Sequence, residues 1–124
     1  MTKARYEIDG ARFDDLQGFY DEVSRKLIPG AEWGRNLDAF NDVLHGGFGT
    51  PPEGFILVWR NSELSRQRLG HSEYAKLVER QLKHYRSEQR LAELDAARAG
   101  RGRTVFDLLL GIVRGNPDVE LILE

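Results

Sequence analysis

The run Phe55-Ile56-Leu57-Val58-Trp59 constrains the fold more than any other segment, because its consecutive apolar residues leave no polar face. A strand with one face in water alternates apolar and polar residues, whereas a strand covered on both faces is apolar throughout. The preceding Pro51-Pro52-Glu53-Gly54 is rich in turn-forming residues and marks a connection. We therefore expect a central strand, covered on both faces, that begins at Phe55.

Further strands and helices are expected on either side of this run. Strands are predicted at residues 4–8 and 119–123, and helices at about residues 14–27, 37–45, 62–99 and 104–113. Strands separated by helices imply parallel pairing with right-handed crossovers. The sequence thus predicts an α/β fold with a small three-stranded parallel sheet packed with helices.

The middle of the chain is helical by pattern, but its arrangement is open. Ser72 can cap a longer helix, and a polar break at Ser87-Glu88-Gln89 interrupts the apolar stripe of that helix. Either one bent helix or a helical hairpin is consistent with this pattern. The Gly100-Arg101-Gly102-Arg103 segment ends it.

Length and composition favour one globular domain over residues 1–124. The chain is 40% hydrophobic and 31% charged, and it contains no cysteine. No apolar run reaches the length of a membrane span, and no apolar signal segment follows the first Met. We expect a cytoplasmic protein without a disulfide framework, thiol catalysis or a common structural zinc site, and we expect no cofactor.

The small net charge of −2 conceals an uneven distribution of charge. Residues 60–103 carry 11 Lys and Arg against 6 Asp and Glu, a net of +5, and the remainder carries 7 against 14, a net of −7. An acidic surface repels nucleic acid and attracts cationic partners. This division favours a basic protein as the partner of the acidic part.

The predicted helix at residues 37–45 has two different faces. Asn36 is a favourable N-cap, and the apolar centre of the helix lies near Phe40. Asp38, Asp42 and His45 fall on the opposite face, at spacings of four and three residues. Like charges at i, i+4 cost a helix about 0.2–0.5 kcal/mol, and only Asp38 lies in the first turn, where the helix dipole could offset this cost. The alternative to a binding role is that both carboxylates solvate the surface of the helix.

Aromatic residues stand beside glycines on both sides of this helix. Trp33 precedes Gly34, and Phe48 lies within the loop His45-Gly46-Gly47-Phe48-Gly49. Loops that hold aromatics beside a charged helix face are typical of a contact surface. The alternative is that each aromatic covers the core at a helix end, and Phe48 is the better candidate for an exposed contact.

The pattern Gly34-x-Asn36-Leu37-Asp38-Ala39-x-x-Asp42 resembles the barstar family, whose members inhibit the ribonuclease barnase. The opening Tyr6 to Gly10, the strand end at Trp59-Arg60 and the segment from Thr104 to Leu123 are similar to the family as well. The resemblance covers residues 4–60 and 104–124. It implies a barstar-like domain with a helical insertion at about residues 62–103.

The resemblance also implies a mechanism, in which an acidic helix enters the active site of a basic ribonuclease and blocks it. Asp42 matches the main anchor of the family, and Asp38 matches its neighbour on the same face. The partner-binding residues expected on this basis are Trp33, Gly34, Asn36, Asp38, Asn41, Asp42, His45, Gly47 and Phe48. The expected partner is a basic ribonuclease, with no direct nucleic acid, no membrane and a monomeric inhibitor.

Several positions depart from the family pattern. Glu32-Trp33 stands where the family has a tyrosine pair, and Asn41 stands where it has a tryptophan beside the anchor. Two acidic positions of the family fall on Gly111 and Gly115. These changes remove flanking contacts and retain the central charge, so we expect a nuclease other than barnase as the target.

Two other functions are considered. Asp38, Asp42 and His45 form an Asp-x3-Asp-x2-His pattern that could hold a hard metal ion or supply a general base, but no nucleophile constellation accompanies it. In the second alternative, the chain is a non-inhibitory interaction module that docks through basic residues of the helical segment, Arg80, Lys83, Arg86 and Arg90. A salt-bridged solvent face, with Glu79 opposite Lys83, would explain the same charges.

Overall fold

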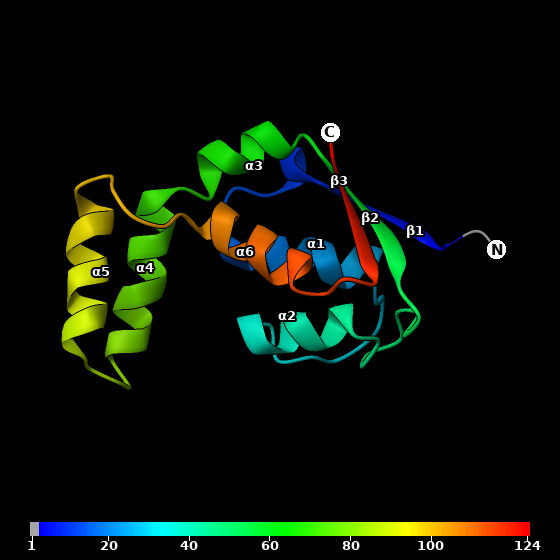
Figure 1. Cartoon of the computed structure of the whole chain (residues 1–124), viewed down its shortest axis with the longest axis horizontal. Helices are drawn as coiled ribbons and strands as arrows, with labels where there is room; N and C mark the ends of the chain where they lie inside the picture. Colours follow the sequence, from blue (N-terminus) through cyan, green and yellow to red (C-terminus); the bar gives the residue numbers. More distant parts are fainter. Residues whose placement is uncertain (1–2) are drawn as a thin grey trace.

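The computed structural model of the chain describes residues 3–124, and its centre is a three-stranded parallel sheet (Figure 1). The strands are β1 (Arg5–Asp9), β2 (Phe55–Arg60) and β3 (Val119–Leu123), in the order β1-β2-β3. Leu57 of β2 lies in register with Tyr6 on one side and with Leu121 on the other. The predicted α/β fold with a small parallel sheet is therefore confirmed.

The connections between the strands are helical. The helices are α1 (Leu16–Lys26), α2 (Leu37–Leu44), α3 (Ser62–Arg68), α4 (His71–Leu82), α5 (Glu88–Arg98) and α6 (Val105–Arg114), with a 3-10 turn η1 at Gly10–Arg12. Asp15 and Thr104 accept hydrogen bonds from Gly18 N and Asp107 N, so they cap α1 and α6. These two caps are at or next to the positions that the sequence predicted.

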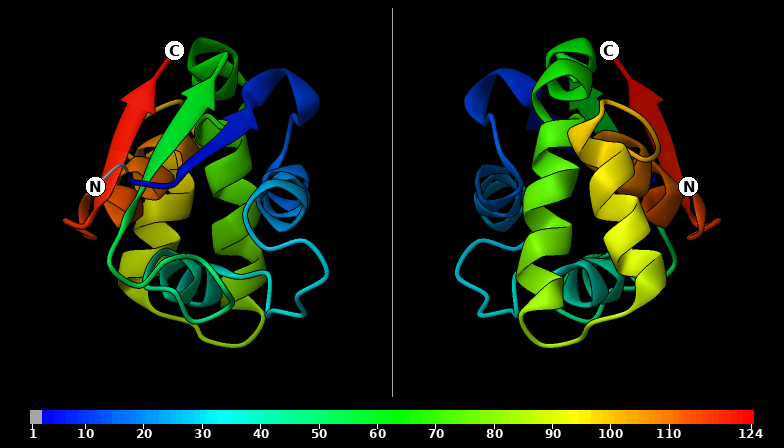
Figure 2. Two further views of the ribbon diagram at one scale, coloured as in Figure 1. Left: turned by 90° about the vertical axis from the view of Figure 1, so that its right-hand side faces the viewer. Right: turned by 90° about the vertical axis from the view of Figure 1, so that its left-hand side faces the viewer.

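The helices cover one face of the sheet, whereas the sequence predicted coverage of both faces for β2. Figure 2 shows the sheet with no helix over its outer face in the part of the chain that the structure describes. Val58 on that face is nevertheless fully buried, between its register partners Glu7 and Ile122. The second face of β2 is therefore buried at Val58, as expected for a strand covered on both faces, although no helix lies over it in the described part of the chain.

The inner face of the sheet carries the core. Trp59 is fully buried, stacks on Phe19 of α1 with ring centroids 5.3 Å apart, and meets the edge of Phe106 of α6 at 5.2 Å. Its indole N–H donates to the hydroxyl of buried Ser65 at 2.9 Å. A large aromatic side chain with a satisfied polar group thus joins three helices to the central strand.

The middle of the chain forms a helical hairpin, α4 and α5, which settles the question that the sequence left open (Figure 1). Ser87 begins α5 as its N-cap and accepts from Arg90 N at 3.0 Å. The predicted cap at Ser72 is wrong, because α4 begins one residue earlier at His71, after Gly70, and has no side-chain cap.

The hairpin packs against the rest of the molecule through buried residues. Val78 of α4 and Leu94 of α5 belong to the same hydrophobic cluster as the sheet residues. The buried carboxylate of Glu73 accepts a hydrogen bond of 3.1 Å from the first amide of α1, Leu16 N. Within residues 3–124, no helix has both the length and the apolar content needed to cross a bilayer.

Candidate functional site

Helix α2 presents the predicted site, and its local sequence explains how it is held. The Asn36 side chain accepts from Ala39 N at 2.7 Å and thereby satisfies one of the free amides of the first turn. Phe40 and Val43 on the inner face of the helix are 0% exposed. An eight-residue helix is not stable alone, so this buried face, together with the cap, sets the position of α2.

Asp38 and Asp42 lie exposed on the outer face of α2, as the sequence predicted. Neither carboxylate forms an ion pair within residues 3–124. Asp38 lies in the first turn, where the helix dipole favours a negative charge, but Asp42 lies in the second half of the helix. Two carboxylates are therefore presented together without an ion-pair partner in the described part of the chain.

His45 and Asn41 lie beside these carboxylates, and both are fixed by hydrogen bonds. His45 is exposed at the end of α2, and its Nδ1 lies 3.0 Å from the carbonyl oxygen of Asn41. A carbonyl can only accept, so this contact requires the proton on Nδ1. The Asn41 side chain accepts from the Asn116 amide at 2.9 Å, a tie to the turn between α6 and β3 that the sequence did not indicate.

The loop after α2 folds back onto the end of that helix. Gly46 has a φ of +92°, and a Cβ there would lie 2.9 Å from both Pro52 Cα and the Thr50 carbonyl oxygen. Gly47 N donates to the Asp42 carbonyl at 2.9 Å, and the buried Thr50 hydroxyl donates to the Val43 carbonyl. Glycine at position 46 is thus required for a loop that closes against Asp42.

The two aromatic residues beside α2 are less exposed than a free contact would be. Phe48 is half-buried and packs against the core, although the sequence favoured it as an exposed contact. Trp33 is also half-buried, donates its indole N–H to Ser24 at 2.7 Å, and meets the edge of the Tyr20 ring at 5.5 Å. Each residue is thus only partly accessible to a partner, and Trp33 also ties the loop to α1.

The segment before α2 contains one feature that sequence reasoning missed. Gly34 is exposed, and the next residue, Arg35, has a φ of +49°, a conformation uncommon for a residue with a side chain. The Arg35 guanidinium is paired with Asp21 of α1, which holds the turn that leads into α2. No local pattern reveals this pair, because the two residues are far apart in sequence.

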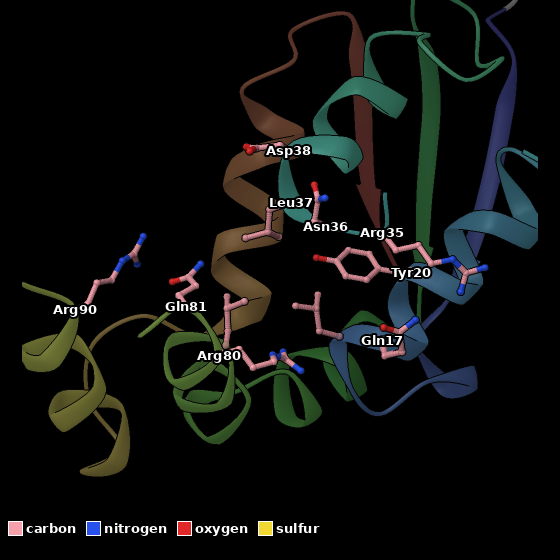
Figure 3. A pocket seen from close by; sticks show the side chains of 11 residues that line it. Gln17, Tyr20, Arg35, Asn36, Leu37, Asp38, Arg80, Gln81 and Arg90 are labelled. Carbon is pink, nitrogen blue, oxygen red and sulfur yellow. The ribbon is translucent and has the colours of Figure 1, made fainter. Parts of the chain in front are cut away.

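A cleft of about 650 Å³ separates the beginning of α2 from the α4–α5 hairpin (Figure 3). It is lined by Leu16, Gln17, Tyr20, Arg35, Asn36, Leu37, Asp38, Leu77, Arg80, Gln81 and Arg90. Burial raises the pKa of Tyr20 to about 12, although the positive charge of Arg80 acts in the opposite direction. The cleft therefore places the acidic helix opposite basic residues of the hairpin.

The metal hypothesis receives no support from the side-chain positions. Among residues 3–124, no group of three His, Cys, Asp or Glu side chains is close enough to hold a metal ion. Asp38, Asp42 and His45 share a face of α2 but do not form such a group. The arrangement is suited instead to charge-assisted hydrogen bonds with a cationic partner.

Comparison with known proteins identifies relatives of the chain. A family model described as "Barstar (barnase inhibitor)" matches residues 4–102. A protein of Bacillus subtilis (strain 168), named "Putative ribonuclease inhibitor YrdF", is 38% identical over 63 residues, which are 51% of this chain and 66% of the relative. The chain thus aligns with just under two thirds of that protein.

The extent of the family match differs from the resemblance found in the sequence. The match runs through the hairpin and ends before α6 and β3, whereas the resemblance lay in residues 4–60 and 104–124. Both ranges contain α2 and its flanking loops.

Proposed function

The chain belongs to the barstar family, and from this premise we propose that it inhibits a basic ribonuclease by inserting the exposed face of α2 into the active site of that enzyme. In this proposal it is not an enzyme, and it serves immunity or self-protection in the cytoplasm. Residues 1–124 act as a single barstar-like domain with a helical insertion at about residues 62–103. The expected contact residues are those on and beside α2.

The observation that carries this proposal is the pair of exposed carboxylates on α2. Asp38 and Asp42 stand on a helix whose opposite face is buried, so their positions are set before any partner arrives. Preorganised charges avoid the entropy cost of ordering side chains on a flexible loop. The active site of a ribonuclease must hold substrate phosphate, and the same cationic groups would accept these carboxylates.

The inhibitory mechanism combines exclusion with electrostatics. A carboxylate that replaces substrate phosphate makes charge-assisted hydrogen bonds to Lys, or bidentate ones to Arg, and the body of α2 excludes RNA from the site. Complementary potentials also accelerate the encounter of the two proteins. Asp42 would act as the main anchor, with Asp38 and His45 at its sides and Gly47 allowing close approach.

Inhibition of barnase itself is expected to be weak or absent. Asn41 replaces a tryptophan of the family beside the anchor, and its side chain is held by Asn116. Gly111 and Gly115 leave two acidic contact positions without a charge. Tight binding of purified barnase in a titration of its activity would contradict this expectation.

The central test compares Asp42→Ala with the wild type against a panel of purified basic ribonucleases of the barnase type. Truncating one partner of a buried charge pair costs about 2–5 kcal/mol of binding free energy, a range to which measurements on the barnase–barstar complex itself contribute. We therefore expect the inhibition constant to rise at least about 30-fold.

Asp95→Ala provides the matched control, since Asp95 is an exposed aspartate in a helix and forms no ion pair within residues 3–124. Its inhibition constant should stay within about twofold of the wild type, as for a surface change outside an interface. Equal inhibition by wild type and Asp42→Ala would refute the placement of the anchor.

A further inference from the structure

Three exposed cations of the α4–α5 hairpin have no ion-pair partner within residues 3–124. They are Arg80, Lys83 and Arg86, which lie at the end of α4 and in the turn that follows it. Tyr85, in the same turn, is 69% exposed. We call Arg80, Lys83 and Arg86 the basic arm.

The salt-bridged solvent face considered from the sequence does not explain the basic arm. Glu79, which the sequence placed opposite Lys83, pairs instead with Arg98 of α5 at 2.9 Å. Arg90 likewise pairs with Glu93. Glu79 and Glu93 are thus used in other pairs, whereas Glu88 and Asp95 of α5 form no ion pair within residues 3–124. The three cations of the basic arm follow one another at intervals of three residues, and like charges this close together are unfavourable in the free protein.

One member of the basic arm, Arg80, faces the acidic helix across the cleft, whereas Lys83 and Arg86 line a separate hollow at the turn of the hairpin. Arg80 and Gln81 of α4 lie across the cleft from Leu37 and Asp38 of α2 (Figure 3). Arg80 and Asp38 line the same cleft, yet they do not pair with each other. Opposite charges therefore stand on the two sides of one opening, each available to a ligand.

We propose that the basic arm is a second contact surface for the same ribonuclease and that it receives an acidic surface segment next to the basic active site of that enzyme. The inference rests on the proposed function, because it takes the partner to be the protein that α2 binds. A partner with a basic centre and an acidic neighbouring segment matches the charge on both sides of the cleft. An RNA strand does not, because its phosphates would be repelled by Asp38 and Asp42.

This second contact would act mainly on orientation and specificity. A single charged anchor allows rotation of the partner about the anchor, whereas two contacts of opposite sign fix one orientation. A basic ribonuclease without the acidic segment would leave the basic arm unpaired and would be bound less tightly. The arm would therefore contribute to the choice among related basic ribonucleases.

The test uses the full chain with the double substitution R80E and K83E, and the probe is the purified barnase-type ribonuclease that the wild type inhibits most strongly. Both residues are exposed, so the fold should be retained, and R80Q serves as a milder variant. We expect the dissociation constant to rise about tenfold or more for the double variant, with most of the change in the association rate. R80Q should show a smaller rise in the same direction.

R101E is the matched control, because Arg101 is an exposed cation in the connection at the opposite end of the hairpin. Its dissociation constant should change by less than about twofold. The dissociation constant of Asp42→Ala for the same ribonuclease is measured in the same series. Suppose that Asp42→Ala binds the ribonuclease more weakly than the wild type does, while the double variant and R101E bind it equally well. That result would overturn the second contact and leave the proposed function standing.

Other outcomes would support the basic arm and count against the proposed anchor. Weaker ribonuclease binding by the double variant, with unchanged binding by Asp42→Ala, would support the basic arm and refute the anchor on α2. Failure of the wild type to inhibit any ribonuclease of the panel would overturn the proposed function, and with it the second contact. Binding of a labelled polyuridine strand that the double variant abolishes, with ribonuclease binding unchanged, would overturn the inference in favour of RNA.

Discussion

The cap of α2 allows a quantitative test of how the site is positioned. The Asn36→Ala substitution removes the acceptor that lies 2.7 Å from Ala39 N and leaves the apolar face of the helix unchanged. Loss of such a cap costs about 1 kcal/mol. For a chain of 124 residues this corresponds to a fall in Tm of about 3–6 °C.

The free energy of the cap also limits how much Asn36→Ala can weaken binding to the ribonuclease. If the first turn of α2 must be ordered in the complex with the ribonuclease, the free-energy cost of ordering it raises the dissociation constant. About 1 kcal/mol is equivalent to about a fivefold increase. Asp38 lies in this first turn, and Asp42 lies beyond it. Loss of the cap should therefore weaken ribonuclease inhibition less than Asp42→Ala does.

Thr104→Ala is the matched control for this experiment. Thr104 caps α6 through its hydroxyl, which accepts from Asp107 N at 3.1 Å, so its loss should lower Tm by a similar amount. Thermal unfolding and inhibition titrations are measured for both variants. An equal loss of inhibition in the two variants would refute local positioning by Asn36, and an unchanged Tm in Asn36→Ala would refute the capping argument itself.

The remaining predictions concern buried polar groups. The pKa of Tyr20 is raised to about 12 from 10.0, chiefly by burial. Its stabilising contribution is therefore present below pH 10 and is lost as the pH rises through 12. Urea unfolding across this range should show a smaller fall in the free energy of unfolding for Tyr20→Phe than for the wild type. Ser65→Ala should lower the free energy of unfolding by about 1–3 kcal/mol, because it removes the partner of the buried Trp59 indole N–H; chemical denaturation with an unchanged midpoint would contradict this.

Local sequence patterns predicted the elements and the acidic face of the candidate site. The apolar run at Phe55, the stripe centred on Phe40 and the cap at Asn36 all describe burial or hydrogen bonding within a few residues. Such features repeat with the period of the helix or strand, so they can be read without knowledge of distant contacts. The positions of Asp38 and Asp42 on one face follow from helical geometry alone.

The predictions that were wrong or incomplete concern choices between alternative partners. Glu79 pairs with Arg98 rather than with Lys83, and Asn41 is held by Asn116. Both outcomes depend on which elements pack side by side, and side-chain spacing within one helix does not contain that information. The failed cap at Ser72 is different, since a suitable residue lay one position past the true start of α4.

The sequence by itself determined that this chain forms an α/β fold with a small parallel sheet and that a short helix carries two carboxylates on one face. Both features follow from the periodic burial of apolar residues. Only the tertiary structure decided that helices cover a single face of the sheet and that Trp33 is tied to α1. It also decided that Asp38 of the acidic helix and Arg80 of the basic arm face each other across a cleft. These features join residues far apart in the chain, and they exist only after packing brings α1, α2 and the hairpin together.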